Sequence, residues 1–443
     1  MVAEVHGVSQ DLSVDRELAG TTVCREGEKI MKKESRKFDL ILWGATSFVG
    51  KIIAEYLLER LSEVPDFRWA LGARNPDKLA QLQSELGSEL PVFVGDSFDR
   101  SFLEEMVSQT SVILSTVGPY MKYGESLVAA CALKGTDYCD LTGEVGFVQK
   151  MVDQYEDRAR ESGARLVNCS GFDSLPSDLG VLHLNDYCDR VLGSPLHTVE
   201  MQVRAAKGGV SGGTVASGIE TVAQLQKDPG LKSVLANPYA MCPEGMRSGV
   251  RQPSLSAAKR SEFNGDWLHD FVMAPVNTKV VHASNARLDY PYGEDFTYSE
   301  WQVANSALMA YLGRFGVGAA MLALYFPWTR ALLQRFVLPE PGEGPDRKTR
   351  EQGYFALLFC GVTRAGKTVT CRVTGDADPG YGSTAKQISE VAIGLATSLP
   401  LSEKSGGFWT PASSLGLKLK EPLTKYAGLK FETPVEGLTP RPA

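Results

Sequence analysis

The residues with the clearest chemical potential form a glycine-containing turn that begins at position 44. The turn follows the apolar run Phe38–Trp43, precedes residues with helical spacing, and reads Gly44-Ala45-Thr46-Ser47-Phe48-Val49-Gly50. Glycine at position 44 permits a tight turn, and glycine at position 50 permits a helix to pack closely on a strand. Amides at the start of such a helix bind pyrophosphate, so the turn predicts a dinucleotide site. Ser47 stands where a glycine is often found, and its small side chain still permits close approach of the backbone.

The end of the second predicted strand indicates which dinucleotide binds. An acidic residue there would hold the ribose hydroxyls of NAD, but this sequence reads Gly72-Ala73-Arg74. The planar cation of Arg74 suits a 2′-phosphate, so the predicted cofactor is NADP. After the third predicted strand, Asp96 is a candidate acceptor for the adenine amino group. The alternative is that Asp96, or Asp99, caps a helix.

Polar residues that follow strand ends are the candidates for the remaining chemistry of a reductase. Val117-Gly118-Pro119 ends the fourth predicted strand, where the nicotinamide half of the cofactor is expected. Tyr120 is the first choice as proton donor, because a phenol can hydrogen-bond a carbonyl or enolate oxygen. The other candidates behind strand ends are Glu144, Asp173 and Ser174. The alternative is structural: Tyr120 packs in the core, and the two acids cap the helices that follow them.

A second glycine-containing stretch is compatible with two roles. Ser211-Gly212-Gly213-Thr214, with Ser217 behind it, suits a helix start whose amides bind a substrate oxygen. A plain glycine turn explains the same residues.

The elements that must position these residues alternate between strand and helix. Short apolar runs and segments of helical spacing follow one another from position 38 to position 169, as in a doubly wound sheet of about six parallel strands. We therefore predict an α/β fold with a Rossmann NADP-binding domain over residues 37–178. A second α+β domain with an antiparallel sheet is predicted over residues 179–384, and residues 385–443 are predicted to pack back on the Rossmann domain. Residues 1–36 are predicted to be a mobile extension.

Residues 301–328 stand out because they carry a single charge, Arg314. One interpretation is a helical hairpin lying on a membrane or lipid-droplet surface as a peripheral contact. The alternative is a buried helix pair or the interface of a homodimer. Spanning is not expected, because each uncharged run is shorter than the roughly 18 residues that a membrane helix needs.

Composition excludes several function classes. The net charge of −7 gives no broad positive field, so no nucleic-acid partner is expected. The eight cysteines form no CxxC pair and the five histidines no close pair, so no metal site is predicted. No GxSxG motif is present, which disfavours hydrolysis. Residues 1–36 lack the apolar core of a secretory signal, so an intracellular, cytoplasmic location is expected.

Several motifs together resemble the saccharopine-dehydrogenase-like oxidoreductases. They are the turn at 44–50, Gly72-Ala73-Arg74, Val117-Gly118-Pro119-Tyr120, Tyr138-Cys139-Asp140-Leu141-Thr142-Gly143-Glu144, Ser170-Gly171-Phe172-Asp173-Ser174-Leu175-Pro176-Ser177-Asp178, Asp378-Pro379-Gly380-Tyr381 and Gly406-Gly407-Phe408-Trp409-Thr410-Pro411. The sequence is most similar to two branches, the animal saccharopine-dehydrogenase-like oxidoreductase and the mycobacterial trans-acting enoyl reductases of lipid biosynthesis. The resemblance implies an NADP-binding Rossmann domain, a second α+β domain and, for the animal branch, association with lipid droplets or membranes. The polar side chains with which true saccharopine enzymes grip an amino acid are not recognisable here.

Two hypotheses follow for the function. In the first, the chain is an NADPH-dependent reductase, similar to the enoyl reductases, that acts on a lipid or polyketide-type acyl substrate. In the second, it keeps the cofactor fold but serves as a structural protein at a membrane or lipid droplet without robust catalysis.

Overall fold

The computed structural model describes residues 36–435 except 65, 209–211, 255–257, 327, 330–343, 399 and 401. These residues all belong to one unit, residues 31–443. The predicted N-terminal extension therefore lies, apart from Arg36, outside the described residues. The side chain of Arg36 is buried and donates to the carbonyl oxygen of Lys134 over 2.6 Å.

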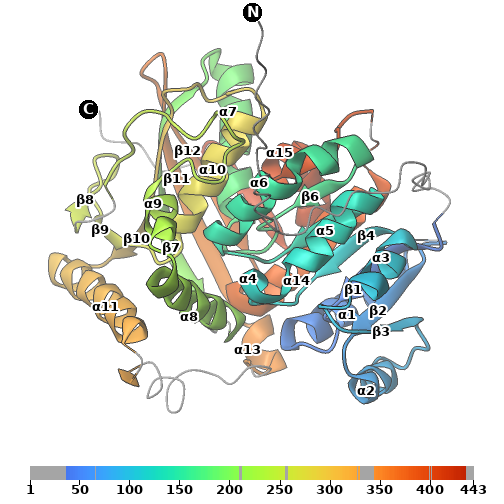
Figure 1. Cartoon of the computed structure of the whole chain (residues 1–443). Coiled ribbons are helices and arrows are strands. Elements are labelled where there is room, and N and C mark those ends of the chain that lie inside the picture. Colours follow the sequence, from blue (N-terminus) through green and yellow to red (C-terminus); the bar gives the residue numbers. More distant parts are fainter. Residues whose placement is uncertain are drawn as a thin grey trace, which may run out of the picture. The chain divides into compact units, whose positions relative to one another are not determined.

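Seven parallel strands form the first sheet, in the order β13-β6-β5-β4-β1-β2-β3 (Figure 1). The strands are β1 (Phe38–Trp43), β2 (Trp69–Ala73), β3 (Val92–Val94), β4 (Thr110–Ser115), β5 (Asp137–Asp140), β6 (Arg165–Val167) and β13 (Gly407–Trp409). The prediction of a doubly wound Rossmann sheet is confirmed. The first six strands are those expected from the sequence, and the C-terminal segment adds a seventh beside β6.

Helices cover both faces of this sheet, which explains why a central strand such as β1 has apolar residues on both of its faces. On β1, Leu40 and Leu42 belong to one core cluster, which includes Leu57 of α1, whereas Ile41 and Trp43 belong to the other. The helices are α1 (Phe48–Leu61), α2 (Pro76–Leu86), α3 (Arg100–Ser108), α4 (Tyr120–Tyr123), α5 (Glu125–Lys134), α6 (Val145–Ser162), α7 (Leu175–Tyr187) and α14 (Thr384–Thr397). Helix α14 comes from the C-terminal part of the chain and packs against α1, β4 and β5.

The second sheet also has seven strands, in the order β14-β12-β11-β7-β10-β9-β8. They are β7 (Leu196–Lys207), β8 (Lys259–Arg260), β9 (Trp267–Asp270), β10 (Thr297–Ala304), β11 (Tyr354–Thr363), β12 (Thr368–Gly375) and β14 (Leu429–Glu432). The expectation of an antiparallel sheet needs one correction, because β7 and β10 pair in parallel. A long connection with three helices joins these two strands, and a parallel pair requires such a crossover.

The remaining helices come from the part of the chain after residue 211. They are α8 (Gly212–Lys227), α9 (Gly230–Ala236), α10 (Ala274–Arg287), α11 (Ala307–Tyr325), α13 (Arg347–Glu351), α15 (Pro411–Ser414) and α16 (Lys420–Lys425), with single turns of other helix types at Cys188–Leu192, Pro379–Ser383 and Gly416–Leu419.

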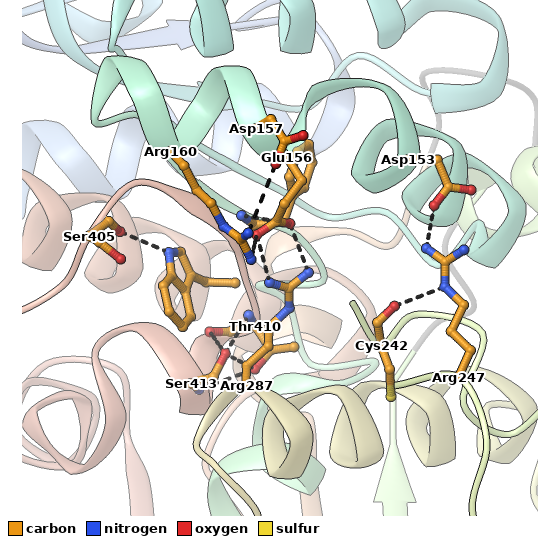
Figure 2. A network of polar contacts seen from close by, with 12 residues as sticks. Asp153, Glu156, Asp157, Arg160, Cys242, Arg247, Arg287, Ser405, Thr410 and Ser413 are labelled. Carbon is orange, nitrogen blue, oxygen red and sulfur yellow. Dashed lines mark hydrogen bonds and ion pairs between the residues drawn. The ribbon is translucent and has the colours of Figure 1, made fainter. Parts of the chain in front are cut away.

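A polar network joins α10 to α6 and to β13 of the Rossmann sheet (Figure 2). Helix α10 belongs to the part of the chain that forms the second sheet, which is called the second half below. The guanidinium of Arg287 lies 3.1 Å from a carboxylate oxygen of Glu156, and the same oxygen accepts the backbone amide of Phe408 over 3.4 Å. Both charged side chains are mostly buried. The ion pair therefore fixes α10 against the Rossmann sheet.

The apolar segment 301–328 forms neither the helical hairpin nor the buried helix pair, whereas the lipid contact and the homodimer interface stay predictions. Residues 301–304 end strand β10, with Trp301 buried, and the long helix α11 follows instead of a helical hairpin. The buried-pair interpretation is also wrong, because Leu308 is 64% exposed and Phe315 is 69% exposed. Among the described residues, α11 is the one helix that is long and apolar enough to cross a membrane, by length and composition alone.

Candidate active site

The turn at 44–50 lies between the carboxyl end of β1 and the start of α1. Gly44 has a φ of +92°, and its amide donates to the carbonyl oxygen of Gly72 over 2.8 Å. A Cβ atom at Gly50 would lie 2.3 Å from the carbonyl oxygen of Gly44, which is closer than any side chain tolerates. Both glycines are therefore required by the geometry that the sequence predicted for a dinucleotide-binding turn.

Ser47 has a structural task that glycine could not perform. Its hydroxyl accepts the amide of Gly50 over 3.0 Å and caps α1. It also lies 3.0 Å from the hydroxyl of Thr116, which follows β4 and in turn contacts the carbonyl oxygen of Gly44. Because β1 and β4 flank the point at which the strand order reverses, this bridge closes the base of the expected cofactor site.

The rest of the turn provides backbone amides, rather than side chains, for binding a ligand. Ala45 is fully buried, and no acceptor among the described residues takes the amides of Thr46, Phe48 or Val49. The ring of Phe48 packs edge-on against Tyr381, 4.7 Å between centroids. The first turn of α1 therefore presents free N–H groups beside a fixed aromatic side chain, which suits an anionic pyrophosphate.

Arg74 follows directly after β2, as the sequence predicted. Its side chain is exposed and makes no ion pair with any described residue. Asp96 accepts the amide of Phe98 over 2.9 Å in the turn after β3, and Asp99 caps α3 through the amide of Phe102. The capping role that the sequence left open therefore falls to Asp99, whereas the adenine contact of Asp96 stays a prediction.

The segment after β4 leads into the short helix α4. The amide of Val117 lies 3.4 Å from the Ser115 hydroxyl, Gly118 donates to the Thr116 carbonyl, and Pro119 precedes the first residue of α4. Tyr120 is buried, and burial raises its pKa well above the ordinary range. Its hydroxyl donates to the carbonyl oxygen of Ser115 and accepts the amide of Leu141. This position matches the structural alternative for Tyr120, and it gives the proton-donor prediction no support.

The carboxylate of Glu144 lies at the start of α4 and is held by three donors. It accepts the amides of Tyr120 and Met121, each over 2.8 Å, and the hydroxyl of Ser217 over 2.6 Å. The Glu144 side chain makes no cap hydrogen bond with α6, the helix that follows it. It caps α4 instead, because it accepts the amides of the first two residues of that helix. Burial raises the pKa of Glu144 despite these donors. A carboxyl with a raised pKa, linked to a hydroxyl from the second half, is suited to hold a proton.

Asp173 and Ser174 precede α7. Ser174 is the N-cap residue of this helix, and its side chain makes no cap hydrogen bond there, whereas both roles considered for Asp173 stay predictions. The hydroxyl of Ser174 donates to Asn277 over 2.9 Å. The amide of Asn277 donates to Glu300, which is fully buried and whose pKa is raised by burial to about 7. Ser174 therefore connects the carboxyl edge of the Rossmann sheet to a buried polar network of the second half.

Comparisons with known proteins identify the family. A protein of Mycobacterium tuberculosis named as a trans-acting enoyl reductase is 38% identical over 418 residues, covering 91% of this chain and 99% of that protein. The trans-acting enoyl reductase of Mycobacterium ulcerans is 34% identical, covering 87% of this chain and 95% of that protein. The chain belongs to the trans-acting enoyl reductase family. It is therefore an oxidoreductase, and the resemblance seen in its motifs is confirmed.

Other comparisons add less. No protein-family model matches the chain. Apo saccharopine dehydrogenase (L-Glu forming) from Saccharomyces cerevisiae aligns with 89% of this chain and 99% of its own, at 13% identity and a TM-score of 0.49.

Two polar residues of the candidate site, Thr116 and Asp140, were not singled out from the sequence. Thr116 bridges the cofactor turn, yet it reads as an ordinary strand-end threonine. Asp140 is fully buried at the end of β5, and burial raises its pKa to about 6. It accepts the amides of Thr142 and Cys169. An acidic residue at the end of a short strand of the buried sheet is the signal that could have identified Asp140, because buried carboxylates require several donors.

Proposed function

We propose that this oxidoreductase uses NADPH to reduce an enoyl group on a lipid or polyketide-type acyl chain. The observation that carries the proposal is the set of free amides at the first turn of α1 beside the glycines at 44 and 50, with the unpaired Arg74 behind the next strand. The enoyl group is taken from the names of the mycobacterial relatives.

The residues present fit NADPH. Gly44 and Gly50 leave room at the turn that any Cβ would fill, and the α1 amides would hold the pyrophosphate. Arg74 would hold the 2′-phosphate through charge-assisted hydrogen bonds. When bound, the cofactor supplies a hydride to the β-carbon of the enoyl group.

The chain must then deliver a proton to the α-carbon. We propose that Glu144 holds this proton at its carboxyl and delivers it through Ser217, whose hydroxyl lies 2.6 Å away. The hydroxyl gives its own hydrogen to the α-carbon, and the proton of Glu144 replaces that hydrogen on the Ser217 oxygen. The amides of Tyr120 and Met121 orient the carboxyl, and burial keeps its pKa raised. Glu144 is preferred to Tyr120 because the Tyr120 hydroxyl is already engaged by backbone groups in the core.

A direct test is consumption of NADPH in the presence of a panel of enoyl thioesters of increasing chain length. We expect oxidation that depends on both the enzyme and the double bond, while the saturated thioesters of the same lengths leave NADPH unchanged. Binding of NADPH with no turnover of any enoyl substrate would favour the alternative, a cofactor-binding structural protein.

We also propose that α11 rests on a lipid surface as a peripheral contact, from which the enzyme reaches apolar substrates. The one charge of α11, Arg314, lies 3.5 Å from Asp270 of β9 and so turns toward the protein. The outward side chains are uncharged and include aromatic rings, which favour membrane interfaces. Those at least 46% exposed are Leu308, Met309, Tyr311, Leu312, Phe315, Leu322 and Tyr325. A homodimer contact through the same face is the competing outcome of the test.

A further inference from the structure

A pair of adjoining cavities lies beside α10, on the helix face that carries Pro275, Thr278, Lys279 and His282. The larger has a volume of about 550 Å³ and the smaller about 370 Å³. Both volumes fall in the range of small-molecule sites. Neither cavity includes the cofactor turn or the Glu144 carboxyl.

The segment that covers these cavities, residues 235–253, is firmly attached. The side-chain amide of Gln252 donates to the Tyr239 hydroxyl over 2.7 Å and to the Phe296 carbonyl over 3.1 Å. These contacts attach the segment to the start of β10. Figure 2 shows Arg247 held between the carbonyl oxygen of Cys242 and the carboxylate of Asp153 on α6. The cavities are therefore built by fixed contacts on both sides.

Two basic side chains of α10 line this space. Lys279 is 4% exposed and faces the larger cavity, where its ammonium donates to the Pro275 carbonyl over 2.7 Å. His282 is 3% exposed and faces the smaller cavity, and its Nε2 atom has no partner among the described residues. Three residues apart on one helix, the two side chains are neighbours.

No carboxylate among the described residues forms an ion pair with either of these two bases. Burial alone lowers the pKa of Lys279 to about 8, and burial together with Lys279 lowers the pKa of His282 to about 3. Of the acids at the smaller cavity, Asp295 pairs with Arg364. A buried ammonium without a counter-charge is costly, and a bound anion would remove that cost.

We propose that the α10 cavities form a second ligand site that takes the carboxylate of an apolar acid, with the Lys279 ammonium as its anchor. The walls of the larger cavity suit the hydrocarbon part, because Leu235, Pro238 and Val250 contribute apolar surface there. The Nε2 atom of His282 offers a further polar contact next to the anchor. The site is separate from the proposed hydride-transfer site and does not depend on NADPH.

The test is calorimetric titration of the full chain with octanoate, with octanol as the uncharged counterpart. We expect octanoate to bind at least about tenfold more tightly than octanol, since a charge-assisted contact contributes that much or more. Lys279→Met should weaken octanoate binding by the same factor and leave NADPH binding unchanged. Lys232→Met, on the exposed side of α9 near the cavity, is the matched control and should bind octanoate like the wild type.

Thermal melting keeps the test decisive if a variant is unstable. Lys279→Met removes a buried charge that no carboxylate pairs, so its melting temperature without ligand should equal or exceed that of the wild type. Octanoate should raise the melting temperature of the wild type more than octanol does. The proposal is overturned if octanol matches octanoate, if Lys279→Met binds octanoate as tightly as the wild type, or if the wild type shows no saturable binding.

Discussion

Arg74→Ala should remove most of the preference for NADPH over NADH. Arg74 follows β2, is exposed, and has no ion pair among the described residues, so the substitution disturbs no contact inside the protein. A charge-assisted hydrogen bond contributes about 1.5–3 kcal/mol, and the lower end applies because solvent screens an exposed guanidinium. The dissociation constant of NADPH should therefore rise about tenfold. That of NADH should stay the same, because NADH lacks the 2′-phosphate.

The assay is calorimetric titration of both cofactors into the wild type and the variant at one fixed ionic strength. Arg158→Ala is the matched control, because Arg158 is an exposed arginine that pairs with Glu161 near the end of α6. It removes the same charge far along the helix from the carboxyl edge of the sheet. Equal affinity of the wild type for both cofactors, or an equal loss of NADPH affinity in Arg158→Ala, would refute the role given to Arg74.

Three further predictions concern the turn, the proton and the surface helix. Gly50→Val should abolish NADPH binding in a folded protein, because its side chain would collide with the turn backbone; unchanged binding by calorimetry would show that the turn has another role. Glu144→Gln should lower kcat about a hundredfold or more, and wild-type kcat should fall as pH rises through the raised pKa of Glu144, because the protonated carboxyl is the active form. Ser217→Ala should lower kcat as well, and a pH profile that is unchanged in Glu144→Gln would contradict this assignment. Leu308→Glu with Leu322→Glu should release the protein from liposomes in flotation assays. The melting temperature should change little because Leu308 is 64% and Leu322 is 59% exposed, whereas a large drop together with no liposome binding by the wild type would exclude the lipid contact.

The sequence was sufficient for the Rossmann sheet because its signals are local. Most of the first six strands are short runs rich in apolar residues, and the helices between them have their own periodic spacing, as β1 and α1 illustrate. The glycines at 44 and 50 were informative for the same reason, since their spacing alone describes the turn. Local patterns are therefore enough to locate the residues of the cofactor turn.

Features that depend on distant parts of the chain were not predictable in this way. Strand β13 joins β6 from more than two hundred residues away, and no local pattern specifies that pairing. The parallel pairing of β7 with β10 is equally non-local, and it overturned the antiparallel expectation. The surroundings of residues 301–328 were also not predictable. An apolar segment with one charge is compatible with burial, with contact to a partner protein or with contact to a lipid surface.

The candidate proton donors Tyr120 and Glu144 show which features of the site the sequence could not predict. The sequence placed both Tyr120 and Glu144 behind strand ends, and the structure has them there. The sequence could not show whether the hydroxyl of Tyr120 would be free to donate a proton. Its hydrogen-bond partners, the carbonyl oxygen of Ser115 and the amide of Leu141, are known only from the folded structure. The contact between Glu144 and Ser217 spans 73 positions and joins the two halves of the chain.

Transfer of deuterium from NADPH that carries deuterium at both C4 positions tests the central claim most directly. The enzyme is incubated with the labelled cofactor and an enoyl thioester in ordinary water, and the saturated product is examined by mass spectrometry. The account predicts one deuterium at the β-carbon, and a hydrogen from solvent at the α-carbon. A saturated product without deuterium, or no saturated product while NADPH binds, would contradict it.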